Sequence, residues 1–222
     1  MTPIDMTQFQ LPERKPKFTN PVRDFEAARN TLFALYERMV RNTASGSLIR
    51  DENTANNVRR VAHWITRSPK KGLLLLGSLG NGKTTMLRTL KVFLDGTGNW
   101  VGPICEATEI WRAERLSCLD DLNDESVVSS KNFIFRCYNE RILIIDDLGV
   151  ENKECKVFGE QRHPLEHLLL HRYTLDLTTI ISTNLKSLDV IEERYGSRVV
   201  DRLYETYDRI VFEGESYRRK KR

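Results

Sequence analysis

The sequence has little cysteine and no long apolar segment. Its four cysteines, Cys105, Cys118, Cys137 and Cys155, lie far apart and form no C-x-x-C pair, so neither a zinc site nor a disulfide framework is expected. No apolar run approaches the ~20 residues that span a membrane, and the first residues lack the apolar core of a signal peptide. We also find no internal repeats. These absences favour a protein of the reducing cytoplasm with free thiols.

A large excess of charge of one sign is also missing. The 222 residues contain 35 Lys+Arg and 31 Asp+Glu, which gives a formal net charge of +4. This mild basic excess is compatible with nucleic-acid binding but is no evidence for it. With 40% apolar and 30% charged residues, the composition is typical of one medium-sized globular domain with an appendage.

A glycine-rich segment stands between a predicted strand and a predicted helix. The apolar run 73–76 ends in the sequence GSLGNGKT, residues 77–84, which matches the phosphate-binding pattern G-x-x-x-x-G-K-[ST]. Apolar residues then recur at helical spacing from 86 to 94. The backbone N–H groups of such a loop and the positive end of the next helix attract phosphate.

We therefore predict a site for ATP and Mg²⁺ at this segment, with Lys83 on the β- and γ-phosphates and Thr84 on the metal. The alternative is a glycine-rich turn before an ordinary helix. The predicted nucleotide contacts are Gly77, Ser78, Leu79, Gly80, Asn81, Gly82, Lys83, Thr84 and Thr85.

Two further strands are predicted to end in polar residues. The segment RILIIDDLG, residues 141–149, is a buried strand that ends in Asp146 and Asp147, the Walker B pattern. Because ligands of such sheets bind at the carboxyl ends of strands, we expect Asp146 to hold Mg²⁺ and Asp147 to activate water. The strand TTIIST, residues 178–183, is followed by Asn184, which is predicted to contact the γ-phosphate or the attacking water.

The rest of the chain is predicted to be mainly helical. Helices over 24–41 and 52–66 carry apolar stripes that either pack on the core or dock a partner. The spacing of His163, His167 and His171 indicates a partly exposed helix face, since no acidic or thiol partner accompanies them. Further predictions are an extended leader over 1–22, strands over 100–106 and 209–212, a helix from a Thr108 cap to 118, an acidic loop over 119–130, and helices over 130–138, 164–176, 187–195 and 198–207.

The order of these motifs resembles the AAA+ ATPases, most closely the DnaC-like helicase loaders and the IstB-like transposition helpers. Beyond the P-loop, the resemblance is carried by ILIIDDLG, IISTN, YGSRVVDRLYE and GESYR, and it covers about residues 50–218. It implies an α/β P-loop NTPase fold of the AAA+ type, in which helices flank a five-stranded parallel sheet of order 5-1-4-3-2. The implied division is a flexible leader over 1–22, a short N-terminal helical extension over 23–50 and an ATPase domain over 51–222, without a separate lid.

The resemblance also implies roles for three arginines. Arg202 in VVDRL matches the arginine finger that acts on ATP in a neighbouring subunit, and Arg198 is a second candidate nearby. Arg218 in GESYR matches the sensor-2 arginine, which contacts the phosphates of its own subunit. Asp147 departs from the glutamate that many AAA+ proteins carry after the Walker B aspartate.

The implied activity is ATP hydrolysis in a homo-oligomer on DNA, with single-stranded DNA as the expected form and a replicative helicase or a transposase as the partner. DNA contacts are expected from the tail 218–222 and from the helix near Arg112 and Arg115. The alternatives are a transposition helper on double-stranded DNA, a P-loop kinase of a small metabolite, and an ATP-binding adaptor that barely hydrolyses.

Overall fold

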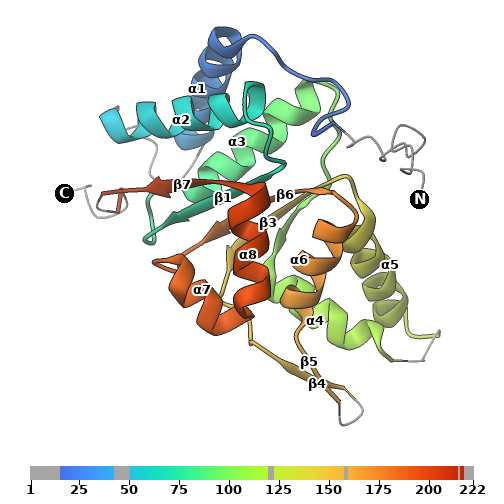
Figure 1. Ribbon diagram of the computed structural model, residues 1–222. Helices are drawn as coiled ribbons and strands as arrows, with labels where there is room; N and C mark the ends of the chain where they lie inside the picture. The colour runs from blue at the N-terminus through green and yellow to red at the C-terminus, as the bar shows by residue number, and fades with distance from the viewer. Residues whose placement is uncertain (1–15, 43–50, 120–122, 158–159, 215, 218–222) are drawn as a thin grey trace, which may run out of the picture.

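The computed structural model describes residues 16–42, 51–119, 123–157, 160–214 and 216–217 (Figure 1). The helices in these ranges are α1 (Phe25–Arg41), α2 (Glu52–Thr66), α3 (Lys83–Gly96), α4 (Ala107–Ser117), α5 (Glu125–Asn139), α6 (Pro164–Thr174), α7 (Leu188–Tyr195) and α8 (Ser197–Thr206). The strands are β1 (Gly72–Gly77), β2 (Ile104–Glu106), β3 (Ile142–Leu148), β4 (Cys155–Val157), β5 (Glu160–Arg162), β6 (Thr178–Thr183) and β7 (Tyr207–Phe212).

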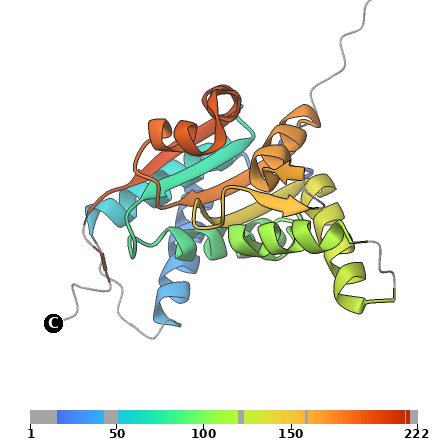
Figure 2. The same cartoon turned by 90° about the horizontal axis from the view of Figure 1, so that it is seen from below.

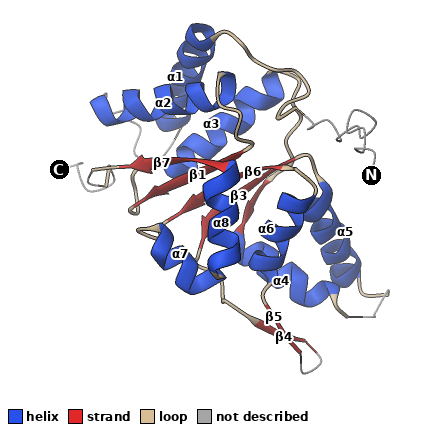
Figure 3. Cartoon of the chain, viewed as in Figure 1, coloured by secondary structure: helices blue, strands red, loops and turns tan. Residues whose placement is uncertain are grey.

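Five strands form a parallel sheet in the order β2-β3-β6-β1-β7 (Figure 3). The other two, β4 and β5, pair antiparallel as a separate hairpin. The predicted order 5-1-4-3-2 differs from the observed order in its labels, because β4 and β5 precede β6 in the chain and were not predicted. Since all five strands run the same way, their carboxyl ends meet at one edge of the sheet.

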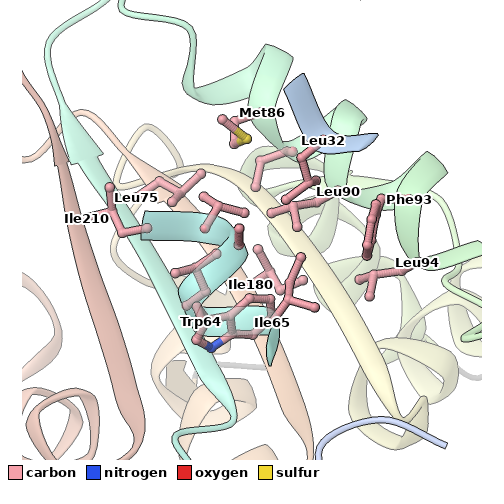
Figure 4. Close-up of a cluster of buried hydrophobic side chains, with 14 of the residues drawn as sticks. Leu32, Trp64, Ile65, Leu75, Met86, Leu90, Phe93, Leu94, Ile180 and Ile210 are labelled. Carbon is pink, nitrogen blue, oxygen red and sulfur yellow. The ribbon is translucent and has the colours of Figure 1, made fainter. Parts of the chain in front are cut away.

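Helices cover both faces of the sheet (Figures 1 and 2). Along β1, Leu73 and Leu75 join the cluster beneath α1, α2 and α3, whereas Leu74 and Leu76 join the cluster on the opposite face. Figure 4 shows part of the first cluster, in which Trp64 of α2 packs near β1. The continuous apolar runs of the sheet strands follow from this burial on two sides, because both sets of alternating side chains leave water.

The first two helices begin at aspartate caps. The Asp24 side chain accepts a hydrogen bond from the Ala27 N–H, and the Asp51 side chain accepts one from Thr54. The apolar stripe of each helix is buried against the core, which is the first of the two roles that the sequence analysis gave for it. The opposite face of α2 is exposed and polar.

A buried arginine ties the C-terminal end of α5 to the start of β6. Arg172 of α6 is fully buried, and its guanidinium donates to the Cys137 and Glu140 carbonyls at 2.7 and 2.9 Å. It also donates to the Thr178 carbonyl at 2.7 Å and to the Thr179 hydroxyl at 2.9 Å. These bonds join the C-terminal end of α5 to the first residues of β6. The sequence analysis did not single out this residue.

Several predicted boundaries were wrong. β2 is limited to Ile104–Glu106, because the chain before it has no ladder partner in the described sheet. Thr108 lies inside α4, which is preceded by Glu106. The expected acidic loop is shorter, since the Asp124 carboxylate caps α5 at its N-terminus.

The division into a leader, an extension and an ATPase domain stays a prediction, as does the absence of a lid. Most of the leader lies outside the described residues, and so do the tail 218–222 and the end of the extension. Among the helices of the described ranges, none combines the length and the apolar character that a membrane crossing requires.

Candidate nucleotide-binding site

The loop between β1 and α3 has the backbone that its glycines allow. Gly80 and Gly82 have φ values of +84° and +89°, in the left-handed region that residues with a Cβ rarely adopt. Gly82 is the N-cap of α3, so the N-terminus of this helix faces the loop. The surface of the loop is open, with Ser78 exposed and Leu79 68% exposed. A bound anion therefore has access to the helix N-terminus.

Lys83 turns back over the same loop. Its ammonium group donates to the carbonyls of Gly77 and Ser78, at 2.6 and 2.8 Å, and to Oδ1 of Asn184, at 2.9 Å. Only 5% of the residue is exposed. Burial lowers the pKa of Lys83, while the charges of Asp147 and Asp146 act to raise it. The Lys83 ammonium therefore lies against the loop at which the sequence pattern predicts that it contacts phosphate.

The two aspartates stand at the end of β3, as predicted. The Thr84 hydroxyl lies 3.3 Å from Oδ1 of Asp146 and donates to it, although the two residues belong to different elements. The Ser182 hydroxyl of β6 also donates to this carboxylate, and it accepts the Asp147 N–H at 3.0 Å. Asp147 has a φ of +55°, a strained value for a residue with a side chain.

Asn184 joins the loop to the second aspartate. Its Oδ1 accepts from Lys83, and its Nδ2 donates to Oδ1 of Asp147 at 2.9 Å. Burial and the neighbouring Asp146 charge raise the pKa of Asp147, whereas the hydrogen bond from Asn184 and the charge of Lys83 oppose the shift. The structure therefore brings together residues from the ends of β1, β3 and β6.

The oxygen atoms near Thr84 suit a hard divalent cation. A hydroxyl and a carboxylate converge between α3 and β3, and Mg²⁺ prefers oxygen ligands together with substrate phosphates and water. The described ranges hold no cluster of three or more His, Cys, Asp or Glu side chains with metal-site geometry.

Asn81 anchors the loop through its side chain. Its Nδ2 donates to the carbonyls of Phe212 and Gly214, at 2.9 and 3.0 Å, so the amide faces the end of β7. Thr85 is half-buried in the first turn of α3.

Two residues of this site were missed by the sequence analysis. Ser182 lies within the predicted strand 178–183, where the sequence analysis gave it no role, although a serine in a buried strand is a usable signal. Tyr217 donates its N–H to the Gly80 carbonyl at 3.1 Å, and its hydroxyl lies 2.9 Å from the Asp51 carboxylate. The GESYR segment thereby contacts the loop through its tyrosine.

The candidate arginines do not join this cluster in the described residues. Arg198 is exposed on α8. Arg202 pairs with Glu205 at 3.3 Å, and its guanidinium lies 4.6 Å from the ring centroid of Tyr173 at the end of α6. Arg218 lies outside the described residues.

The comparisons with known proteins bear on the fold. No family model matches the chain, and no curated protein matches it in sequence. Among solved structures, the DnaC helicase loader aligns with a TM-score of 0.55 and 23% identity, over 79% of this chain and 99% of that one. DnaI aligns with a TM-score of 0.56 and 18% identity, over 81% of this chain and 92% of that one.

AMPPCP-bound DnaA from Aquifex aeolicus aligns with a TM-score of 0.55 and 18% identity, over 82% of this chain and 52% of that one. At these identities the likeness shows a shared fold alone. The resemblance that the motifs indicate is therefore confirmed for the fold. The chain shares its α/β fold, with a five-stranded parallel sheet, with the DnaC helicase loader, DnaI and DnaA.

Proposed function

We propose that the chain binds ATP with Mg²⁺ at the loop 77–84 and hydrolyses it. The observation that supports this most strongly is the hydrogen-bonded series from Lys83 through Asn184 to Asp147. These contacts bring the Lys83 ammonium, the Asn184 amide and the Asp147 carboxylate together beside one glycine-rich loop. A second contact, between Thr84 and Asp146, supplies oxygens for the metal.

Each side chain has a separate role in this proposal. Lys83 would bind the terminal phosphates in place of the loop carbonyls, and Thr84 with Asp146 would hold Mg²⁺, which would neutralise developing phosphate charge. Asp147 accepts the proton of the attacking water. Asn184 keeps the Asp147 carboxylate oriented and contacts the transferred phosphate.

The proposed hydrolysis requires a second copy of the chain. Arg202 stacks on Tyr173, which lies just before the start of β6, whereas the loop 77–84 follows the end of β1. Because β1 and β6 are parallel and six residues long, these positions are separated by about 20 Å of strand. Arg202 therefore serves the site of a neighbouring protomer, with Arg198 beside it and Arg218 acting within its own subunit.

We further propose that the assembled protein acts in DNA replication, as a helicase loader on single-stranded DNA. The fold shared with DnaC and DnaI supports this role. A replicative helicase is the proposed protein partner, and a transposase is the alternative.

Mixing two inactive variants tests the shared site. Lys83→Ala removes the phosphate-binding cation but leaves Arg202 intact, whereas Arg202→Ala does the reverse. In an equal mixture, about a quarter of the head-to-tail interfaces combine an intact loop with an intact arginine. We expect phosphate release to recover to about that fraction of the wild-type rate when DNA is present and no metabolite acceptor is added.

The wild type and each single variant are the controls. Phosphate release that stays at the level of the single variants would refute the shared site, while wild-type hydrolysis would still support the ATPase. A wild type that needs a small-molecule acceptor would instead indicate a kinase. Light scattering with ATP and DNA should report a mass above that of the monomer.

A further inference from the structure

The exposed side of α2 carries a continuous polar and basic stripe. Asn53, Asn56, Arg60, His63 and Arg67 recur every three or four residues along α2 and its C-cap, so they lie on one side of the helix. All but the half-buried Asn53 are exposed. The apolar residues of α2 pack into the core on the other side, and the helix therefore presents this stripe to solvent beside α1 and β7 (Figure 1).

Two neighbouring hollows follow the stripe. One, of about 450 Å³, lies between α2 and β7 and is bordered by Val211 and Glu213. The other, of about 510 Å³, lies between α1 and α2 and is bordered by Phe33. Asn56 and Arg59 line both hollows, so the two form one extended depression.

Two carboxylates border the hollows, Glu213 in the first and Glu37 in the second, and among the described residues neither forms an ion pair with the arginines of this face. Within the described ranges, no acidic side chain pairs with Arg59, Arg60 or Arg67. Arg60 donates to the Arg209 carbonyl of β7 at 2.9 Å, which leaves its charge uncompensated. The Arg67 guanidinium lies 4.5 Å from the ring centroid of Phe25 at one end of the stripe.

We propose that the α2 basic face, defined as Asn53, Asn56, Arg59, Arg60, His63 and Arg67, binds the phosphate backbone of nucleic acid. The stripe from Asn53 to Arg67 extends about 21 Å at the helical rise. In a duplex, each nucleic-acid strand carries a phosphate roughly every 3.4 Å along the axis. The stripe is therefore long enough to contact several successive phosphates of a strand, and it is longer than a single nucleotide. The inference rests on the proposed function, and it assigns the nucleic-acid contact to a surface distinct from the loop 77–84.

The side-chain types favour nucleic acid over an acidic protein segment. An acidic peptide requires donors alone, whereas the amides of Asn53 and Asn56 offer donors and acceptors, as base edges do. The planar pair of Phe25 and Arg67 suits an unstacked base, because aromatic rings and guanidinium planes stack on bases.

Charge removal with a matched control tests the surface. Arg59→Gln together with Arg60→Gln removes two charges from the α2 basic face. Arg112→Gln with Arg115→Gln removes two exposed charges from α4, where the sequence analysis expected a DNA contact, so the two variants compare the two candidate surfaces directly. Binding is measured by the anisotropy of a labelled oligonucleotide, single-stranded or duplex, whichever the wild type binds more tightly. The titrations contain a non-hydrolysable ATP analogue and are repeated over a series of salt concentrations.

We expect the α2 variant to lose about tenfold or more in affinity at low salt, and the α4 variant to lose little. The slope of log K against log salt should fall by about 1.4 for a single strand, since each phosphate contact contributes about 0.7. Arg59→Lys with Arg60→Lys should keep most of the slope. Thermal unfolding and nucleotide affinity should match the wild type, and Arg67→Gln gives the same comparison if the double variant does not fold.

Three outcomes would overturn the inference. They are wild-type affinity in the α2 variant, an equal loss in the α2 and α4 variants, and displacement of the oligonucleotide by polyglutamate as effectively as by polynucleotide. A wild type that binds no oligonucleotide would refute the DNA part of the proposed function as well, so the two failures are distinguishable.

Discussion

Replacing Arg172 with methionine tests how the start of β6 is held to the C-terminal end of α5. Methionine keeps an unbranched side chain but removes all four hydrogen bonds that the guanidinium donates. Three of the acceptors are carbonyls of Cys137, Glu140 and Thr178, which would lose these bonds in the interior. An unpaired buried polar group costs about 1–3 kcal/mol.

The guanidinium also carries a cost of its own. Burial lowers the pKa of Arg172 to about 10, so the group is charged at neutral pH and its transfer from water opposes folding. Summed over three acceptors and reduced by the relief of this desolvation, the expected loss in free energy of unfolding is roughly 3–5 kcal/mol. For a domain of this size, that corresponds to a fall in Tm of roughly 6–20 °C.

Urea denaturation at neutral pH measures the loss, with an unchanged m-value as the sign that only stability has changed. Arg115→Met, on the exposed side of α4, is the control and should change the free energy of unfolding by less than about 0.5 kcal/mol. A loss below about 1 kcal/mol for Arg172→Met would refute the reasoning, because the four hydrogen bonds would then only offset the desolvation of the charge.

Three further predictions concern the site and the core. Asp147→Asn should slow single-turnover hydrolysis by about 10² to 10⁴-fold. Because burial and Asp146 raise the pKa of Asp147, the wild-type pH–rate profile should fall on its acid side at a pH above the ordinary aspartate range, and the variant should lose this dependence. Equal rates in the two proteins would exclude Asp147 as the base. Asn184→Ala should reduce the hydrolysis rate by a larger factor than it reduces ATP affinity, which calorimetry measures, since Lys83 keeps its contacts with the loop carbonyls. A variant that loses ATP affinity but keeps the wild-type rate would contradict this. Burial lowers the pKa of Lys17 to about 8 from 10.5, so between these two pH values the unfolded state binds more protons than the folded state. The free energy of unfolding of the wild type, relative to that of Lys17→Met, should therefore rise with pH by up to about 3 kcal/mol in urea denaturation. A difference that stays constant with pH would refute this prediction.

The nucleotide loop and the strand ends could be predicted because their signals are local. Spacing within residues 77–84 predicts the glycine-rich loop. The apolar run before Asp146 and the strand 178–183 before Asn184 predict two strands of a parallel sheet, whose carboxyl ends meet. The contact between Lys83 and Asn184 then follows from the parallel order of the sheet. The helices α1 and α2 were predictable for the same reason, since their apolar stripes persist over several turns.

Features that depend on distant partners could not be predicted in this way. The three-residue strands β4 and β5 are too short to show an alternating pattern. The start of α5 lies in an acidic segment whose single buried residue in the first turn is Val127, so it resembles a loop. Arg172 stands among polar residues of α6, and nothing in the local sequence indicates that the C-terminal end of α5 accepts its hydrogen bonds.

A crystal structure of the chain with Mg²⁺ and a non-hydrolysable ATP analogue tests the central claim most directly. The account predicts the triphosphate against the backbone of residues 77–84, with Lys83 moved from the loop carbonyls to the phosphates and the metal in contact with Thr84 and Asp146. A triphosphate bound elsewhere, or a saturated crystal in which Lys83 still contacts Gly77 and Ser78 with no nucleotide beside them, would contradict it.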